Sequence, residues 1–147
     1  MTEARFVATF AKYKKDPQGL DFTGFSSAIR EFTETKEPSD ETEQNGLFML
    51  FSFFDTNKNN FLSEKEYMSA LGYLPARYKT LKEAVYMALF KVTDTNGSGK
   101  VNVSEFLKFK KMEGTESSKK VAQDLIASVD MNGDGKLNID EWLNLFI

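Results

Sequence analysis

Oxygen-bearing side chains recur at fixed positions in three twelve-residue segments, 55–66, 94–105 and 130–141. Each segment begins with Asp, ends with Glu, and carries Asn, Ser or Asp at its third, fifth and ninth positions. A loop with oxygens at these positions, together with the main-chain carbonyl of the seventh residue, can surround a hard cation with six or seven ligands. The spacing therefore predicts metal-ligand chemistry.

The predicted ligands follow this pattern in all three loops. They are Asp55, Asn57, Asn59, Phe61, Ser63 and Glu66; Asp94, Asn96, Ser98, Lys100, Asn102 and Glu105; and Asp130, Asn132, Asp134, Lys136, Asn138 and Glu141. A Glu at position twelve can supply two oxygens, which suits the seven-fold shell of Ca²⁺ better than the octahedron that Mg²⁺ prefers. We therefore expect about three Ca²⁺ ions per chain, one in each loop.

The three loops differ in their number of acidic ligands. The last loop has three, Asp130, Asp134 and Glu141, whereas the other two loops have two each. Asn60 stands at position six of the loop 55–66, where the backbone turns left-handed and glycine is preferred. We expect the last loop to bind most tightly and the loop 55–66 most weakly, in the sensor range of roughly 10⁻⁷ to 10⁻⁵ M or weaker.

Each loop needs a helix on either side to position its ligands. The loop starts are separated by 39 and 36 residues, which leaves room for a loop and two short helices. Ser63, Asn102 and Asn138 at position nine each precede the final Glu by three residues. Each pair can therefore cap the outgoing helix, which links the ligands to the direction of that helix, as a switch requires.

Loops of this kind pair through a short strand at position eight, so three copies predict a fourth upstream of Asp55. The segment at about 13–24 keeps the outline, with Leu20 as its strand residue and Phe25 opening the next helix. Position one is either Tyr13 or Lys14, depending on the register. Neither register supplies the first and last carboxylates, so we expect a structural loop that binds no ion.

These loops resemble those of the calmodulin superfamily of EF-hand proteins, and the resemblance covers nearly the whole chain. The run from Lys14 to Gly19 is similar to the degenerate first hand of neuronal calcium sensor proteins, whereas the 36-residue separation of the last two loops is more like calmodulin. The resemblance implies an all-α fold of two lobes, each containing paired helix-loop-helix units with short two-residue β bridges between paired loops. In sensor members, calcium opens a lobe and exposes an apolar groove for a target helix.

Gly72 and Pro75 interrupt the segment between the second and third hands, because glycine costs helix stability and proline disfavours helix in the preceding residue. We expect an N-terminal lobe at 1–72 that contains loops 13–24 and 55–66. A hinge at 73–79 then leads to a C-terminal lobe at 80–147, which contains loops 94–105 and 130–141.

Composition narrows the function classes. The chain has no Cys and no His, so it lacks the thiolate nucleophile and the commonest general base, and we expect no enzyme activity. A formal charge of −3 without a dense basic cluster gives no reason to expect nucleic-acid binding. Residues 1–5 lack a secretion signal, Thr2 stands where myristoylation needs glycine, and no apolar stretch approaches about 20 residues. We expect a cytoplasmic protein with possible access to the nucleus and no membrane anchor.

These features favour a monomeric calcium sensor that engages an amphipathic helix of a target protein. Two alternatives stay open. One is a calcium buffer, which binds ions but barely opens. The other is a constitutive subunit resembling a myosin light chain, which holds its partner helix with or without metal.

Overall fold

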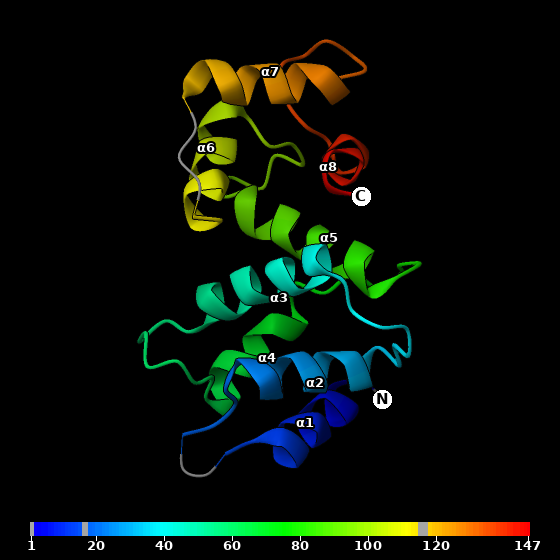
Figure 1. Cartoon of the computed structure of the whole chain (residues 1–147), viewed down its shortest axis with the longest axis vertical. Coiled ribbons are helices and arrows are strands. Elements are labelled where there is room, and N and C mark those ends of the chain that lie inside the picture. The colour runs from blue at the N-terminus through cyan, green and yellow to red at the C-terminus, as the bar shows by residue number, and fades with distance from the viewer. Residues whose placement is uncertain (1, 16–17, 115–117) are drawn as a thin grey trace. The chain divides into compact units, whose positions relative to one another are not determined.

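The computed structural model describes residues 2–15, 18–114 and 118–147, and its regular elements are helical (Figure 1). The helices are α1 (Thr2–Tyr13), α2 (Phe22–Phe32), α3 (Glu41–Phe54), α4 (Glu64–Leu71), α5 (Leu81–Thr93), α6 (Val103–Met112), α7 (Lys119–Val129) and α8 (Ile139–Phe146). The four predicted loops lie between successive pairs of these helices, and we number them loop 1 (13–24), loop 2 (55–66), loop 3 (94–105) and loop 4 (130–141). The predicted all-α fold of paired helix-loop-helix units is confirmed.

The chain divides into two compact units, Met1–Val85 and Tyr86–Ile147, and we call these the N-terminal and C-terminal units. The division falls inside α5, whereas the sequence suggested a lobe boundary at residue 72 and a hinge at 73–79. Residues 72–80 contain no helix, as Gly72 and Pro75 predict. Lys82 in the first turn of α5 forms an ion pair with Asp40, the N-cap of α3. This pair is one reason why the start of α5 belongs with the N-terminal unit.

The core of the N-terminal unit joins α1 to α4. Phe6 of α1 stacks on Tyr67 of α4 with ring centroids 4.1 Å apart and planes inclined by 5°. The Tyr67 hydroxyl lies 2.7 Å from the Thr9 hydroxyl, and both side chains are buried. Burial raises the pKa of Tyr67, so the phenol stays neutral. The helix that leaves loop 2 is therefore fixed to the first helix of the chain by stacking and by a buried hydrogen bond.

The core of the C-terminal unit is built around Trp142 of α8. This side chain is fully buried and its ring centroid lies 4.7 Å from that of Phe109 on α6 and 5.7 Å from that of Phe90 on α5. Its indole N–H donates to the carbonyl of Tyr86 at 2.8 Å. The residue that directly follows the last predicted ligand, Glu141, therefore holds α8 against the other helices of its unit.

Candidate metal centre

The loops lie in pairs, each joined by an antiparallel bridge of one residue from either loop. In the N-terminal unit, Leu20 and Leu62 exchange main-chain hydrogen bonds of 2.9 and 2.7 Å. In the C-terminal unit, Val101 and Leu137 exchange two bonds of 2.8 Å. The bridges predicted at position eight are thus present in both units, and they place loop 1 beside loop 2 and loop 3 beside loop 4.

The bridge also decides the register of loop 1. Leu62 is the eighth residue of loop 2, so its partner Leu20 is the eighth of loop 1, which puts Tyr13 at position one. Asp21 at position nine is the N-cap of α2 and accepts a hydrogen bond of 2.7 Å from the N–H of Gly24. The expectation that Phe25 opens this helix was wrong. The helix begins three residues earlier, at Phe22, because Asp21 caps it there.

The first Asp of loops 2, 3 and 4 is held in the same way. Its Oδ2 accepts a hydrogen bond from the main-chain N–H at position six, which has a positive φ in every case. The bonds are Asn60 to Asp55 at 2.9 Å, Gly99 to Asp94 at 2.7 Å and Gly135 to Asp130 at 2.8 Å. A left-handed residue at position six therefore turns an N–H toward the first carboxylate, and the structure shows why this position prefers glycine.

The final Glu of each of these loops joins both ends of the loop. One carboxylate oxygen accepts from the N–H at position nine and the other from the N–H at position two. The donors are Ser63 and Thr56 for Glu66, Asn102 and Thr95 for Glu105, and Asn138 and Met131 for Glu141, at 2.7–3.1 Å. The three predicted capping boxes are confirmed, and each Glu lies in the first turn of the exit helix, α4, α6 or α8.

These hydrogen bonds affect the ionisation of Glu66. Burial by itself would raise its pKa, but the hydrogen bonds from Ser63 and Thr56 outweigh burial and lower the pKa. The side chain is therefore held as a carboxylate at neutral pH, which is the form that binds a cation.

Loop 4 brings three carboxylates together. One oxygen from each of Asp130, Asp134 and Glu141 lies within 4.8 Å of the other two, and within the described residues this is the one group of three acidic side chains so arranged. The donors are all oxygens, as a hard cation requires. The residues present therefore fit a Ca²⁺ ion in this loop.

The amide and hydroxyl positions also have a common arrangement. Side-chain oxygens at positions three and five accept main-chain hydrogen bonds from the residue two places further on. They belong to Asn57, Asn59, Asn96, Ser98, Asn132 and Asp134. The oxygens at position nine, on Ser63, Asn102 and Asn138, accept instead from the N–H of the final Glu. The position-nine residues thus face the exit helix, a placement that suits contact with an ion through water.

Loop 2 differs from its counterparts at two left-handed positions. Lys58 and Asn60 have φ values of 56° and 67°, whereas loops 3 and 4 have glycine at both corresponding positions, four and six. The left-handed backbone at Asn60 was predicted from the sequence, whereas that at Lys58 was not. The signal was available, because Gly97 and Gly133 mark position four in the other two loops.

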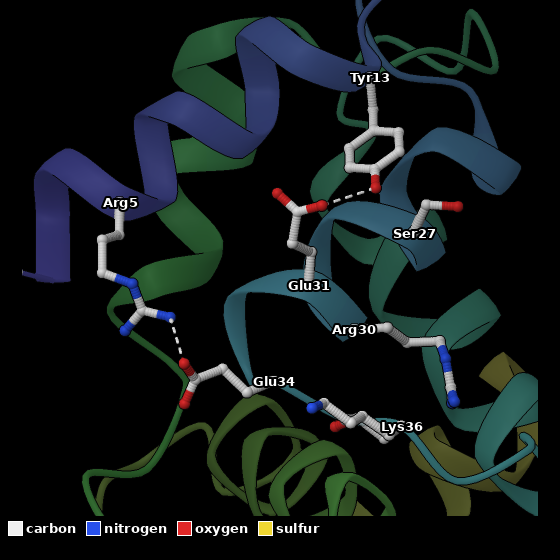
Figure 2. Close-up of a pocket in the computed structure, with 8 residues that line it drawn as sticks. Arg5, Tyr13, Ser27, Arg30, Glu31, Glu34 and Lys36 are labelled. Atoms are coloured by element: carbon white, nitrogen blue, oxygen red, sulfur yellow. Dashed lines mark hydrogen bonds and ion pairs between the residues drawn. The ribbon is translucent and has the colours of Figure 1, made fainter.

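Loop 1 contains a cation of its own. The ammonium of Lys15 at position three lies 2.7 Å from a carboxylate oxygen of Asp21 at position nine. This contact, with the Gly24 N–H, lowers the pKa of Asp21. Tyr13 at position one points out of the loop and donates its hydroxyl hydrogen to Glu31 at 2.8 Å (Figure 2). The side chains at positions one, three and nine of this loop therefore contact other groups of the protein.

Tyr13 and Glu31 belong to the lining of a surface cavity of about 940 Å³ between α1 and α2 (Figure 2). Several of its charged groups contact other groups of the protein. Arg5 lies 3.9 Å from Glu34 and donates to the Phe32 carbonyl, and Arg30 lies 2.5 Å from Glu43.

Comparison with known families agrees with this geometry. Two matches described as an EF-hand domain pair cover residues 18–73 and 82–147. The chain belongs to the EF-hand family, and its fold and loops define a calcium-binding protein with a regulatory or buffering role. Proteins of this family are typically not enzymes. A comparison with curated proteins gave no match. In the described part of the chain, no helix is both long and apolar enough to cross a membrane.

Proposed function

We propose that this protein is a calcium sensor that binds one ion in each of loops 2, 3 and 4 and then engages an amphipathic helix of a target protein. Loop 1 serves as the structural partner of loop 2. The observation that carries the proposal is the double attachment of the final Glu in each loop, which belongs both to the predicted ligand set and to the first turn of the exit helix.

The residue after each final Glu extends this link into the core. Glu66, Glu105 and Glu141 are followed directly by Tyr67, Phe106 and Trp142, and these aromatic side chains are almost completely buried. A bound ion would gather the loop oxygens into one shell. Any movement of a final Glu toward the loop interior then moves the aromatic residue beside it. Ligand position and core packing are thereby coupled, which favours a sensor over a buffer.

The partner we propose is a helix with an apolar face, because the helices of both units are rich in aromatic and aliphatic side chains. Three bound ions would change the formal charge of the chain from −3 to +3. Long-range attraction of a basic target would then be weak, so apolar contact should supply most of the affinity.

The proposal is tested with an apolar fluorescent dye and a synthetic amphipathic peptide of Leu and Lys residues at helical spacing. The unaltered chain is compared with a Glu66→Gln, Glu105→Gln, Glu141→Gln triple variant. A Glu64→Gln, Asp140→Asn variant is the control, because it changes exposed first-turn carboxylates outside the predicted ligand set. Circular dichroism verifies that each variant is folded.

We expect calcium to increase dye and peptide binding by the unaltered chain and by the control, but not by the triple variant. Calcium binding without any change in dye fluorescence would instead identify a buffer. Equal peptide binding in calcium and in chelator would identify a constitutive subunit. Either result would contradict the sensor proposal.

A further inference from the structure

An ion pair connects the two loops of the C-terminal unit. The ammonium of Lys100, at position seven of loop 3, lies 2.5 Å from Oδ2 of Asp134, at position five of loop 4. Both side chains are partly exposed, with 42% of the Lys100 side chain and 28% of the Asp134 side chain accessible. Lys100 therefore contributes its carbonyl to the predicted ligand set of one loop and its charge to the ligand set of the other.

Among the described residues, this ion pair has no counterpart across the bridge, although the two loops follow the same pattern. The bridge pairs position eight with position eight, so the counterpart of Lys100 and Asp134 is the pair Lys136 and Ser98. Ser98 carries no charge, and Lys136 forms no ion pair with any residue that the structure describes. The two lysines occupy equivalent loop positions, but one of them alone lies on a predicted ligand.

The Lys100 ammonium also lies close to the other carboxylates of loop 4. It donates a hydrogen bond to Asp134, and one oxygen of Asp134 lies within 4.8 Å of an oxygen of Asp130 and of Glu141. A positive charge already lies beside the three side chains that would have to share a Ca²⁺ ion.

We propose that the Lys100 ammonium competes with Ca²⁺ for the carboxylates of loop 4 and brings the affinity of this loop down toward that of loop 3. This inference rests on the proposed function, in which both loops bind calcium. The three carboxylates of loop 4 and one ammonium carry a net charge of −2, which equals that of the two acidic ligands of loop 3. The two sites then fill over the same range of calcium concentration, although their ligand sets differ.

The test isolates loop 4 in the full chain by combining Glu66→Gln with Glu105→Gln, and measures calcium binding by calorimetry and by Trp142 fluorescence. Lys100→Gln is compared in this background with Lys136→Gln, which makes the same change in net charge at the equivalent position. Exposed ion pairs alter equilibria modestly, so we expect Lys100→Gln to tighten calcium binding about two- to fivefold, and Lys136→Gln to have a clearly smaller effect.

A second comparison tests whether Lys100 changes calcium affinity through the Asp134 carboxylate. In an Asp134→Asn background, Lys100→Gln should no longer tighten binding, because the pair is already broken. Equal effects of the two lysine substitutions would show a general charge effect and overturn the inference. Weaker binding by Lys100→Gln would show that the lysine assists Asp134, which also overturns it. If the unaltered chain bound no calcium at all, the proposed function itself would fail, a result distinct from either of these.

Discussion

At the scale of single residues, Glu141 shows how one side chain serves loop and helix together. Its two oxygens accept hydrogen bonds from Asn138 and Met131, at opposite ends of loop 4, and its main chain lies in the first turn of α8. Glu66 and Glu105 repeat this arrangement in loops 2 and 3. Replacing the final Glu would therefore remove a predicted ligand and a helix cap at the same time.

Replacing Glu141 by Gln should weaken calcium binding at loop 4 at least about tenfold, because the loop loses a charged ligand that can offer two oxygens. Trp142 follows directly and is buried, so its fluorescence reports the titration. The matched control is Asp140→Asn, which removes an exposed carboxylate one residue away. Similar affinities for the two variants would contradict the assignment of Glu141 as a ligand.

Replacing Lys58 by Gly should stabilise the N-terminal unit by up to about 1 kcal/mol, because Lys58 has a φ of 56° that glycine adopts without strain. Urea unfolding measures the gain. Lys58→Ala is the control, since it removes the ammonium that donates to the Ser52 carbonyl but keeps a Cβ. If alanine stabilised the unit as much as glycine, backbone strain would not be the cause.

The predicted ligands could be named from the sequence because their spacing within twelve residues is local. The contacts of Lys15 with Asp21 and of Lys100 with Asp134 could not be read in the same way. The first depends on the register of loop 1, and the second joins residues 34 positions apart. The second is set by the pairing of loops 3 and 4 across their bridge, which local spacing does not specify.

At the scale of elements, the helix starts follow from caps that are visible in the sequence. Ser63, Asn102 and Asn138 cap α4, α6 and α8 as predicted. The start of α2 was misplaced because Asp21 lacks the Glu three residues later that marks a capping box, and Gly24 stands there instead. The bridge between Leu20 and Leu62 fixed the register of loop 1, which the sequence had left open.

The pairing of loops 1 and 2 depends on Gly19. Its φ is +113°, and a Cβ placed there would lie 2.1 Å from the carbonyl oxygen of Leu62. Gly19→Ala should therefore destabilise the N-terminal unit by about 1–3 kcal/mol, through backbone strain and displacement of the bridge.

Urea unfolding of Gly19→Ala beside Gly72→Ala provides the comparison. A Cβ at Gly72 would meet nothing nearer than 3.6 Å, and this glycine has an ordinary helical φ of −68°. We expect Gly72→Ala to change stability little. Two alanine variants of equal stability would show that the close approach at Gly19 is not what restricts this position.

At the scale of the whole molecule, the number and order of the helix-loop-helix units followed from the repeats, and the compact units divide at a point that the repeats do not mark. Gly72 and Pro75 mark the end of continuous helix, but the units separate further along, inside α5. The pair of Lys82 with Asp40 helps to explain the difference, because it connects residues 42 positions apart. A contact between residues so far apart in the sequence leaves no pattern in the residues around either of them.

The change in formal charge from −3 to +3 leads to a prediction for target binding. Affinity for the amphipathic Leu-Lys peptide in saturating calcium should fall only slightly as salt rises from low to physiological concentration, because charge attraction contributes little. A peptide of the same spacing with Lys replaced by Glu is the control. A steep loss of affinity for the Lys peptide would contradict a mainly apolar interface.

The central claim is that loops 2, 3 and 4 each bind one Ca²⁺ ion and loop 1 binds none. Calorimetric titration of the full chain with calcium measures this number directly, with Glu66→Gln, Glu105→Gln and Glu141→Gln examined singly. We expect three ions for the unaltered chain and the loss of one site in each variant. A fourth ion, or a Glu substitution that leaves all three sites intact, would contradict the claim.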